Sequence, residues 1–175
     1  MKFYTYSPVY DKNLPWSTKH VYNPSKYFRC TVDDKYVYDK SGKIIGKATN
    51  HVGLTWTVPS TGKKVKQIAY DFGTIRSAGK KSFCDRRSRI VFKGWEPKGG
   101  PYLVLETIGV PSGARYEHLI PHTVATAPLN KWLNPMVPFG RVATKAELPK
   151  GVIPHTHYAV AKNGVAISPK LVITG

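Results

Sequence analysis

The spacing of glycine and proline constrains the fold of this chain more than any other feature. The 175 residues include 15 glycines and 14 prolines, and no long segment between them has clean helical periodicity. At most one helical turn is expected, at 130–133. Strand-like runs separated by turn signals occur instead, at 36–38, 44–45, 54–58, 65–70, 89–95, 102–107, 114–119 and 156–162. This pattern predicts a mainly β fold, built as an antiparallel sheet or open barrel.

Two histidines one residue apart stand at the start of the last long strand-like run. Alternate side chains of a strand project from the same face, so His155 and His157 are expected to point together into one site. Two imidazoles on one face, joined by a carboxylate from elsewhere in the chain, can build a zinc site that keeps one position open for water. His118 and Asp71 are the candidates to complete such a site.

Three sequence blocks in order resemble the lysostaphin-like (LytM-type) zinc metalloendopeptidases. That family carries G-P-H-x-H-F-E-V near the end of its domain, and this chain reads Ile153-Pro154-His155-Thr156-His157-Tyr158-Ala159-Val160. The family also has a strand followed by aromatic-x-His-Leu, which is similar to 102–106 followed by Tyr116-Glu117-His118-Leu119. Upstream, the family's H-x-x-x-D-F and Gly-Thr turn resemble 67–74, which reads Gln67-Ile68-Ala69-Tyr70-Asp71-Phe72-Gly73-Thr74.

The resemblance implies a role for each matching residue. Asp71 and His157 would be zinc ligands, and His118 and His155 would be the catalytic histidines that position or deprotonate the attacking water. Gln67 departs from the pattern, because the family has its first metal-ligand histidine there. An amide oxygen is a poorer zinc ligand than an imidazole nitrogen. Three outcomes stay open: Gln67 coordinates weakly, His51 or His20 supplies the ligand, or the site binds metal poorly.

The resemblance also implies a division of the chain and a function. Residues 51–175 would form the peptidase domain, and residues 1–50 an N-terminal extension or arm, rich in aromatic residues and lysine. The function implied is zinc-dependent cleavage of the peptide cross-links of bacterial peptidoglycan. The alternative is a catalytically degenerate member of the family that binds the cell wall or has a structural or regulatory role.

The net charge of the chain indicates which kinds of partner it can bind. Lys and Arg number 27 against 10 Asp and Glu, for a net charge of +17, and such a surface attracts polyanions. With the histidine pattern, we interpret this charge as targeting to anionic envelope polymers. Nucleic acid is the least favoured partner, although 80–81 and 86–89 would suit phosphate binding.

The remaining signals concern delivery and redox state. No apolar run approaches the ~20 residues that span a bilayer, and the first residues lack a secretory signal. A phage lysin, or a hydrolase carried in a virion and released to the cell wall, is therefore expected. Cys30 and Cys84 do not form a C-x-x-C pair, and free thiols are the default expectation.

Overall fold

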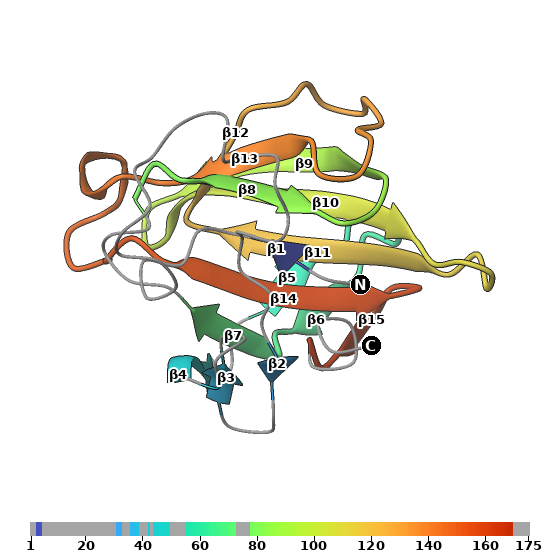
Figure 1. Cartoon of the computed structure of the whole chain (residues 1–175), viewed down its shortest axis with the longest axis horizontal. Helices are drawn as coiled ribbons and strands as arrows, with labels where there is room; N and C mark the ends of the chain where they lie inside the picture. The colour runs from blue at the N-terminus through green and yellow to red at the C-terminus, as the bar shows by residue number, and fades with distance from the viewer. Residues whose placement is uncertain are drawn as a thin grey trace.

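A computed structural model describes residues 3–4, 31–32, 36–38, 42, 44–49, 55–72 and 78–169. Nearly every regular element in these ranges is a strand that pairs antiparallel with its neighbours (Figure 1). One short 3₁₀ helix, η3, spans Lys145–Glu147. The predicted mainly antiparallel β class is therefore confirmed. None of the helices among the described residues is long and apolar enough to cross a membrane.

The largest sheet has nine strands and carries the predicted site. Its order is β2-β3-β4-β7-β14-β11-β10-β9, and β15 pairs with β14 outside this path. The strands are β2 (Thr31–Val32), β3 (Tyr36–Tyr38), β4 (Ile44–Thr49), β7 (Ala69–Phe72), β9 (Ser88–Glu96), β10 (Gly100–Ile108), β11 (Arg115–Pro121), β14 (Thr156–Lys162) and β15 (Val165–Ile167).

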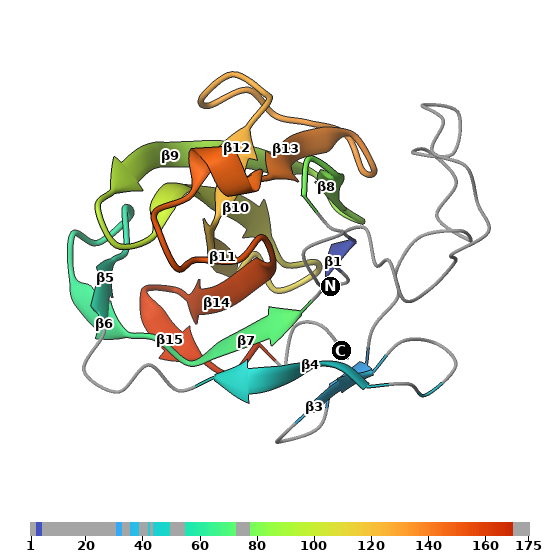
Figure 2. The ribbon, with the colours of Figure 1, turned by 90° about the vertical axis from the view of Figure 1, so that its left-hand side faces the viewer.

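Two smaller sheets complete the fold (Figure 2). The first has four strands in the order β1-β8-β13-β12, which are β1 (Phe3–Tyr4), β8 (Lys81–Cys84), β12 (Thr123–Ala125) and β13 (Pro138–Val142). The second is a hairpin of β5 (Thr55–Thr57) and β6 (Lys64–Lys66).

The four-stranded sheet covers one face of the large sheet. Cys84 and Phe139 from the small sheet pack with apolar side chains of β9, β10, β11 and β14, all of them buried. Phe139, Ile90 and Tyr158 are fully buried, and burial of each large side chain stabilises the fold by roughly 1.5–3 kcal/mol. We call this side of the large sheet the closed face.

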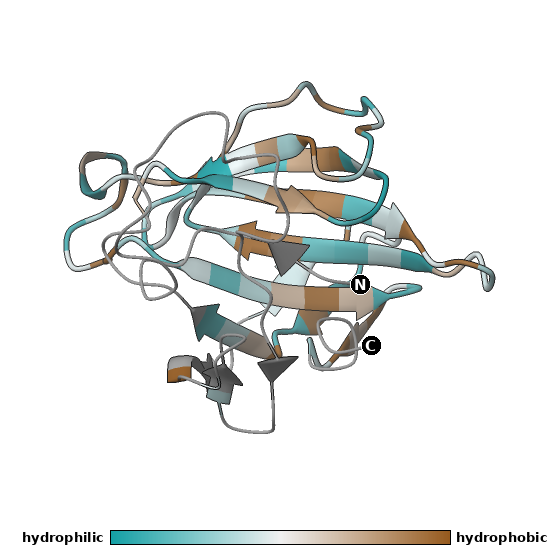
Figure 3. Ribbon diagram, viewed as in Figure 1, coloured by the Kyte–Doolittle hydropathy of each residue, from teal (hydrophilic) through white to brown (hydrophobic). Residues whose placement is uncertain are grey.

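The β5–β6 hairpin packs on the opposite side, which we call the groove face. Trp56 of β5 and the adjoining Val58 form a second buried cluster with Val104, Leu119 and Ala159 of the large sheet, joined by Ala69 and Ala161. Figure 3 shows that β14 changes from hydrophilic at its start to hydrophobic in its second half. The polar start of β14 brings the two predicted histidines to the edge of this cluster.

The structure differs from the predicted strands at three places. The run at 65–70 is divided between β6 and β7, which belong to different sheets. Residues 130–133 form no helical turn: Asn130 has a φ of 61° and Leu133 bridges Ser88. The short strands β1, β2, β8, β12 and β13 were not predicted, because each has only two to five residues and so shows little alternation.

Part of the predicted N-terminal arm is built into the large sheet. β4 pairs with β7, with Gly46 opposite Phe72 and Thr49 opposite Ala69. The division at residue 50 stays a prediction. His20, His51 and Cys30 lie outside the described residues.

Candidate metal centre

The pairing of β7 with β14 brings the predicted carboxylate to the predicted histidine. Asp71 stands opposite His157 in the antiparallel register, and residues directly opposite share a face of the sheet. Asp71 Oδ1 lies 2.6 Å from His157 Nδ1. His155, just before β14, places its Nε2 3.5 Å from the same carboxylate oxygen. The structure therefore brings three residues together from segments more than 80 positions apart.

A third imidazole, which matches no motif in the sequence, joins this group. His122 follows β11 directly, and its ring centroid lies 4.5 Å from that of His155 and 6.1 Å from that of His157. One possible ligand atom from each of the three histidines lies within 4.8 Å of the others. We refer to His122, His155, His157 and Asp71 as the histidine–aspartate cluster.

Each imidazole of the cluster has an oxygen acceptor at one ring nitrogen. His122 Nδ1 donates to the Gly99 carbonyl at 2.8 Å, and His155 Nδ1 donates to the Ile153 carbonyl at 2.5 Å. His157 Nε2 donates to Gln67 Oε1 at 2.8 Å. In a neutral ring, such a bond leaves the other nitrogen with a lone pair. In His155 and His157 that other nitrogen faces the carboxylate of Asp71. Histidines that bind metals are held by partners of this kind.

Gln67 lies beside His157, and the metal-ligand role that the resemblance implies for it stays a prediction. Its side-chain oxygen contacts the Nε2 atom of His157, whereas Asp71 contacts Nδ1 on the other side of the ring. The residue lies at the junction between β6 and β7, where the chain passes from the hairpin to the large sheet. In this position Gln67 orients the His157 ring.

The charges of the cluster favour an ionised carboxylate. Burial alone would raise the pKa of Asp71, but hydrogen bonds and attraction from His155 and His157 outweigh it and lower that pKa well below its usual range. Burial would lower the pKa of His155, but Asp71 and the Ile153 carbonyl raise it on balance. Burial and the proximity of His155 lower the pKa of His122 to about 4, so His122 is neutral at pH 7.

The structure does not bring His118 to the cluster. His118 lies on the closed face, 1% exposed, with its Nε2 2.9 Å from Thr107 Oγ1 and its Nδ1 2.7 Å from the Tyr158 hydroxyl. Its ring stacks between those of Tyr116 and Tyr158. Burial lowers the pKa of His118 to about 3. These contacts are those of a satisfied core residue, unlike the position beside Asp71 that the resemblance implies.

A sequence signal for His122 was present but misleading. His118 and His122 are four positions apart, so simple alternation places both on one face of a strand. The strand ends at Pro121, and His122 takes a φ of 56°, a left-handed conformation that few non-glycine residues adopt. The reversal of the chain there turns His122 toward the groove face.

The donor set of the cluster fits a zinc ion. Imidazole nitrogens and a carboxylate oxygen are typical ligands of catalytic zinc. Asp71 accepts from His157 and lies close to His155, so one cation can replace the proton that now joins these groups. The oxygen acceptors behind the three rings supply the outer support that such a site needs.

A groove of about 680 Å³ adjoins the cluster on the groove face. The β5–β6 hairpin forms one wall and residues of β9 and β10 form the other. Gln67 and Pro121, which line the groove, connect it to His157 and His122. Its lining consists of Thr55, Trp56, Thr57, Pro59, Lys64, Gln67, Phe92, Glu96, Tyr102, Val104, Leu119 and Pro121.

No family model matches this sequence, and no curated protein matches it. Two solved structures are similar at low identity. A zinc-containing peptidase from Vibrio cholerae is 17% identical over 82% of this chain, with a TM-score of 0.48. The match covers 46% of that protein, so this chain spans less than half of its length. LytU is 15% identical, with 84% of this chain and 85% of LytU covered and a TM-score of 0.48. At this level of similarity, function has to be inferred from the residues of the cluster.

Proposed function

We propose that this chain is a zinc-dependent endopeptidase that cleaves the peptide cross-links of bacterial peptidoglycan. The observation that carries the proposal is the histidine–aspartate cluster, in which three imidazoles and one carboxylate converge beside a groove. An oxygen atom of the protein accepts a hydrogen bond from Nδ1 of His122, from Nδ1 of His155 and from Nε2 of His157. A cluster supported in this way is suited to binding a metal rather than to packing alone.

Asp71, His155 and His157 are the proposed zinc ligands. Asp71 Oδ1 lies within 3.5 Å of both histidines, and neighbouring ligand atoms of a tetrahedral zinc site are separated by about 3.3 Å. His155 therefore takes the third ligand position instead of Gln67. Three protein ligands leave a fourth position open, as catalytic zinc sites require.

Bound zinc would supply a water of pKa about 7 and polarise the scissile carbonyl. The protein supplies proton transfer and orientation. His122 is the proposed base: its Nδ1 is anchored on the Gly99 carbonyl, and its ring lies against His155. A neutral imidazole can accept a proton from water and pass it to the leaving amine. His122 thus takes the role that the resemblance implies for His118.

The sequence resemblance and the charge support peptidoglycan as the substrate. A net charge of +17 favours encounter with an anionic envelope. Delivery as a phage lysin or virion-associated hydrolase is part of the same proposal.

Digestion of purified peptidoglycan tests this function. Wild-type protein with zinc should release new amino groups, and a chelator should abolish the release until zinc is restored. The His157→Ala variant should be inactive at the same zinc concentration. Peptidoglycan that stays intact with the zinc-loaded wild type would contradict the proposed activity.

A degenerate, wall-binding protein is the second candidate, because Gln67 stands where the family has a histidine. This candidate predicts that wild-type protein sediments with peptidoglycan but does not cleave it at any zinc concentration. Gln67→His would then restore tight zinc binding. Cleavage by the wild type on addition of zinc would exclude this candidate.

A further inference from the structure

The groove beside the cluster is built from two rigid walls. On the β9–β10 side, the rings of Phe92 and Tyr102 stack with centroids 5.8 Å apart and an interplanar angle of 28°. Tyr102 lies directly over Gly94, where an added Cβ would be 2.8 Å from the tyrosine hydroxyl oxygen and 2.9 Å from two ring carbons. The absence of a side chain at Gly94 therefore lets the tyrosine ring lie flat as part of the wall.

A buried carboxylate holds the opposite wall in place. Glu117 of β11 is 2% exposed, and it accepts hydrogen bonds from the Ser60 backbone N–H at 3.0 Å and from the Ser60 hydroxyl. Ser60 lies in the turn between β5 and β6. This contact, together with burial of Trp56 and Val58, fixes the hairpin against the sheet before any ligand binds. Preorganisation of this kind reduces the cost of binding.

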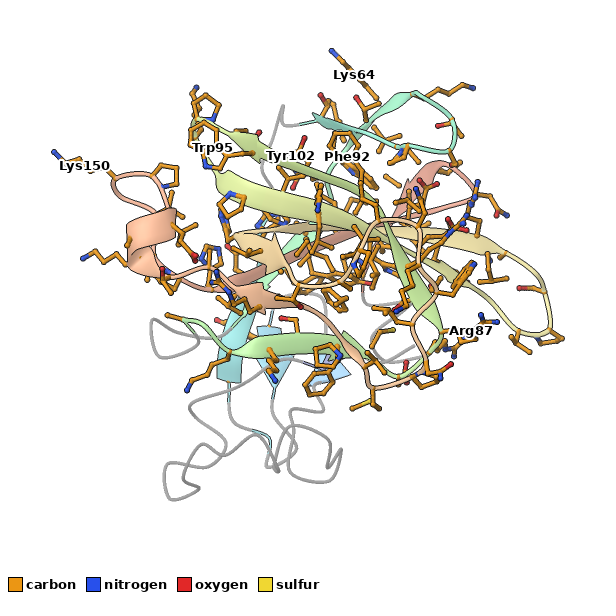
Figure 4. The ribbon with its side chains drawn as sticks, turned by 90° about the horizontal axis from the view of Figure 1, so that it is seen from above. Lys64, Arg87, Phe92, Trp95, Tyr102 and Lys150 are labelled. Carbon is orange, nitrogen blue, oxygen red and sulfur yellow. The ribbon has the colours of Figure 1, made fainter. Side chains whose placement is uncertain are left out.

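The surfaces inside the groove are apolar at the floor and charged at the rim. Val104 and Leu119 form the floor, and Phe92 leaves 45% of its surface exposed above it. Lys64 lies at the rim of the hairpin wall and Glu96 at the rim of the other wall. Among the described residues, Lys64 forms no salt bridge. Figure 4 shows Lys64, Phe92 and Tyr102 on one side of the molecule, with Arg87 and Lys150 elsewhere.

We propose that this groove binds the substrate peptide on one side of the scissile bond and selects its chemistry. An apolar side chain packs against the wall of Phe92 and Tyr102, and a peptide carboxylate is bound by Lys64. This proposal rests on the proposed peptidase function, because the groove is assigned to the same substrate. Its volume of about 680 Å³ is within the usual range for ligand sites.

Two residues, Gln67 and Pro121, join the groove to the histidine–aspartate cluster. A peptide bound in the groove is therefore positioned next to the cluster. Gln67 lines the groove and accepts a hydrogen bond from His157. Pro121 lines the groove and immediately precedes His122. A peptide held between the walls would therefore have its backbone directed toward the proposed base and ligands. Substitutions in the groove should consequently change KM more than kcat.

Calorimetric titration with two synthetic peptidoglycan stem peptides tests the selection. One peptide has free carboxylates and the other has the same sequence with amidated carboxylates. A chelator is present, so that binding is measured without cleavage. Lys64→Glu should weaken binding of the free peptide about tenfold and leave the amidated peptide within twofold of wild type. Lys150→Glu, an equal change of charge outside the groove, should leave the affinity for both peptides within twofold of wild type.

The aromatic wall is tested in the same titration. Phe92→Ala should weaken both peptides about fivefold to tenfold. Trp95→Ala is the matched control, because Trp95 is 63% exposed on the same strand and does not line the groove. Equal effects of Lys64→Glu and Lys150→Glu, or of Phe92→Ala and Trp95→Ala, would overturn the proposal. Failure of the wild-type protein to bind either peptide would also overturn the proposal.

The two proposals fail in different ways. Selective binding of the free peptide without cleavage of peptidoglycan would contradict the peptidase function and support the groove as a peptide site. Cleavage with unchanged KM in Lys64→Glu and Phe92→Ala would support the function and overturn the groove assignment.

Discussion

The two faces of the large sheet each contain histidine, but in opposite settings. On the closed face, His118 is enclosed by Tyr116, Tyr158 and Thr107, and both ring nitrogens have protein partners. On the groove face, His122, His155 and His157 each contact an oxygen acceptor at one ring nitrogen, and the second nitrogen of His155 and of His157 faces the shared carboxylate of Asp71. The residue type is the same and the strands are neighbours. The environment determines which histidines can bind a metal or move a proton.

This comparison shows why a histidine within a family-like motif is not sufficient evidence of a site. His118 stands two positions after the aromatic Tyr116 and directly before leucine, as in the family pattern, yet both of its ring nitrogens are hydrogen-bonded within the core. His122 matches no part of that pattern and lies beside His155. A substitution at each position therefore separates catalytic from structural contributions.

The largest effect on catalysis is expected from His122→Ala. Loss of a group that transfers protons should lower kcat for peptidoglycan cleavage about 10²- to 10³-fold. Zinc content should stay near that of wild type, because three ligands remain. Steady-state kinetics and metal analysis of the same preparation check this result. If His122→Ala cleaved as fast as wild type, His122 would have no role in proton transfer.

A smaller and different effect is expected from His118→Leu. This change leaves the hydroxyls of Thr107 and Tyr158 without their buried partner, which should lower the free energy of unfolding by about 2–4 kcal/mol. Urea denaturation measures this loss, and zinc affinity should not change. A variant of normal stability with lost zinc binding would reverse the assignment of the two faces.

Gln67→Ala tests the support of the cluster. Without the acceptor at Nε2, the His157 ring is no longer held in the tautomer that offers Nδ1, so zinc affinity should fall about tenfold. Gln67→Glu is the matched control, since it keeps an oxygen acceptor at this position. Competition with a zinc-binding dye gives both affinities. An unchanged affinity in Gln67→Ala would show that this hydrogen bond does not orient the ring.

The pH dependence of stability provides the mildest test. Burial lowers the pKa of His118 to about 3, below the value of about 6.5 in an unfolded chain. The unfolded state therefore binds more protons, and this contribution to stability, complete above pH 6.5, is lost as pH falls toward 3. Between pH 7 and pH 5 the loss is about 2 kcal/mol. The free energy of unfolding of His118→Leu should therefore fall by about 2 kcal/mol less than that of wild type between pH 7 and pH 5. Urea denaturation at both pH values, with a chelator present, measures this difference. Identical pH profiles would show that His118 titrates normally.

The sequence predicted the fold class and part of the cluster, for identifiable reasons. Alternation along the run that includes 156–162 predicts His155 and His157 on one side, and the pairing of β7 with β14 sets Asp71 beside them. His122 could not be found in this way, because its left-handed backbone interrupts the alternation. The orientation of Gln67 depends on the passage from β6 to β7 between two sheets, which local sequence does not specify.

Zinc binding to wild type, His157→Ala and His118→Leu, measured side by side at pH 7, tests the central claim most directly. We predict close to one zinc per wild-type chain and per His118→Leu chain, and almost none in His157→Ala. Absence of zinc from folded wild-type protein would contradict the account. So would loss of zinc in His118→Leu together with its retention in His157→Ala.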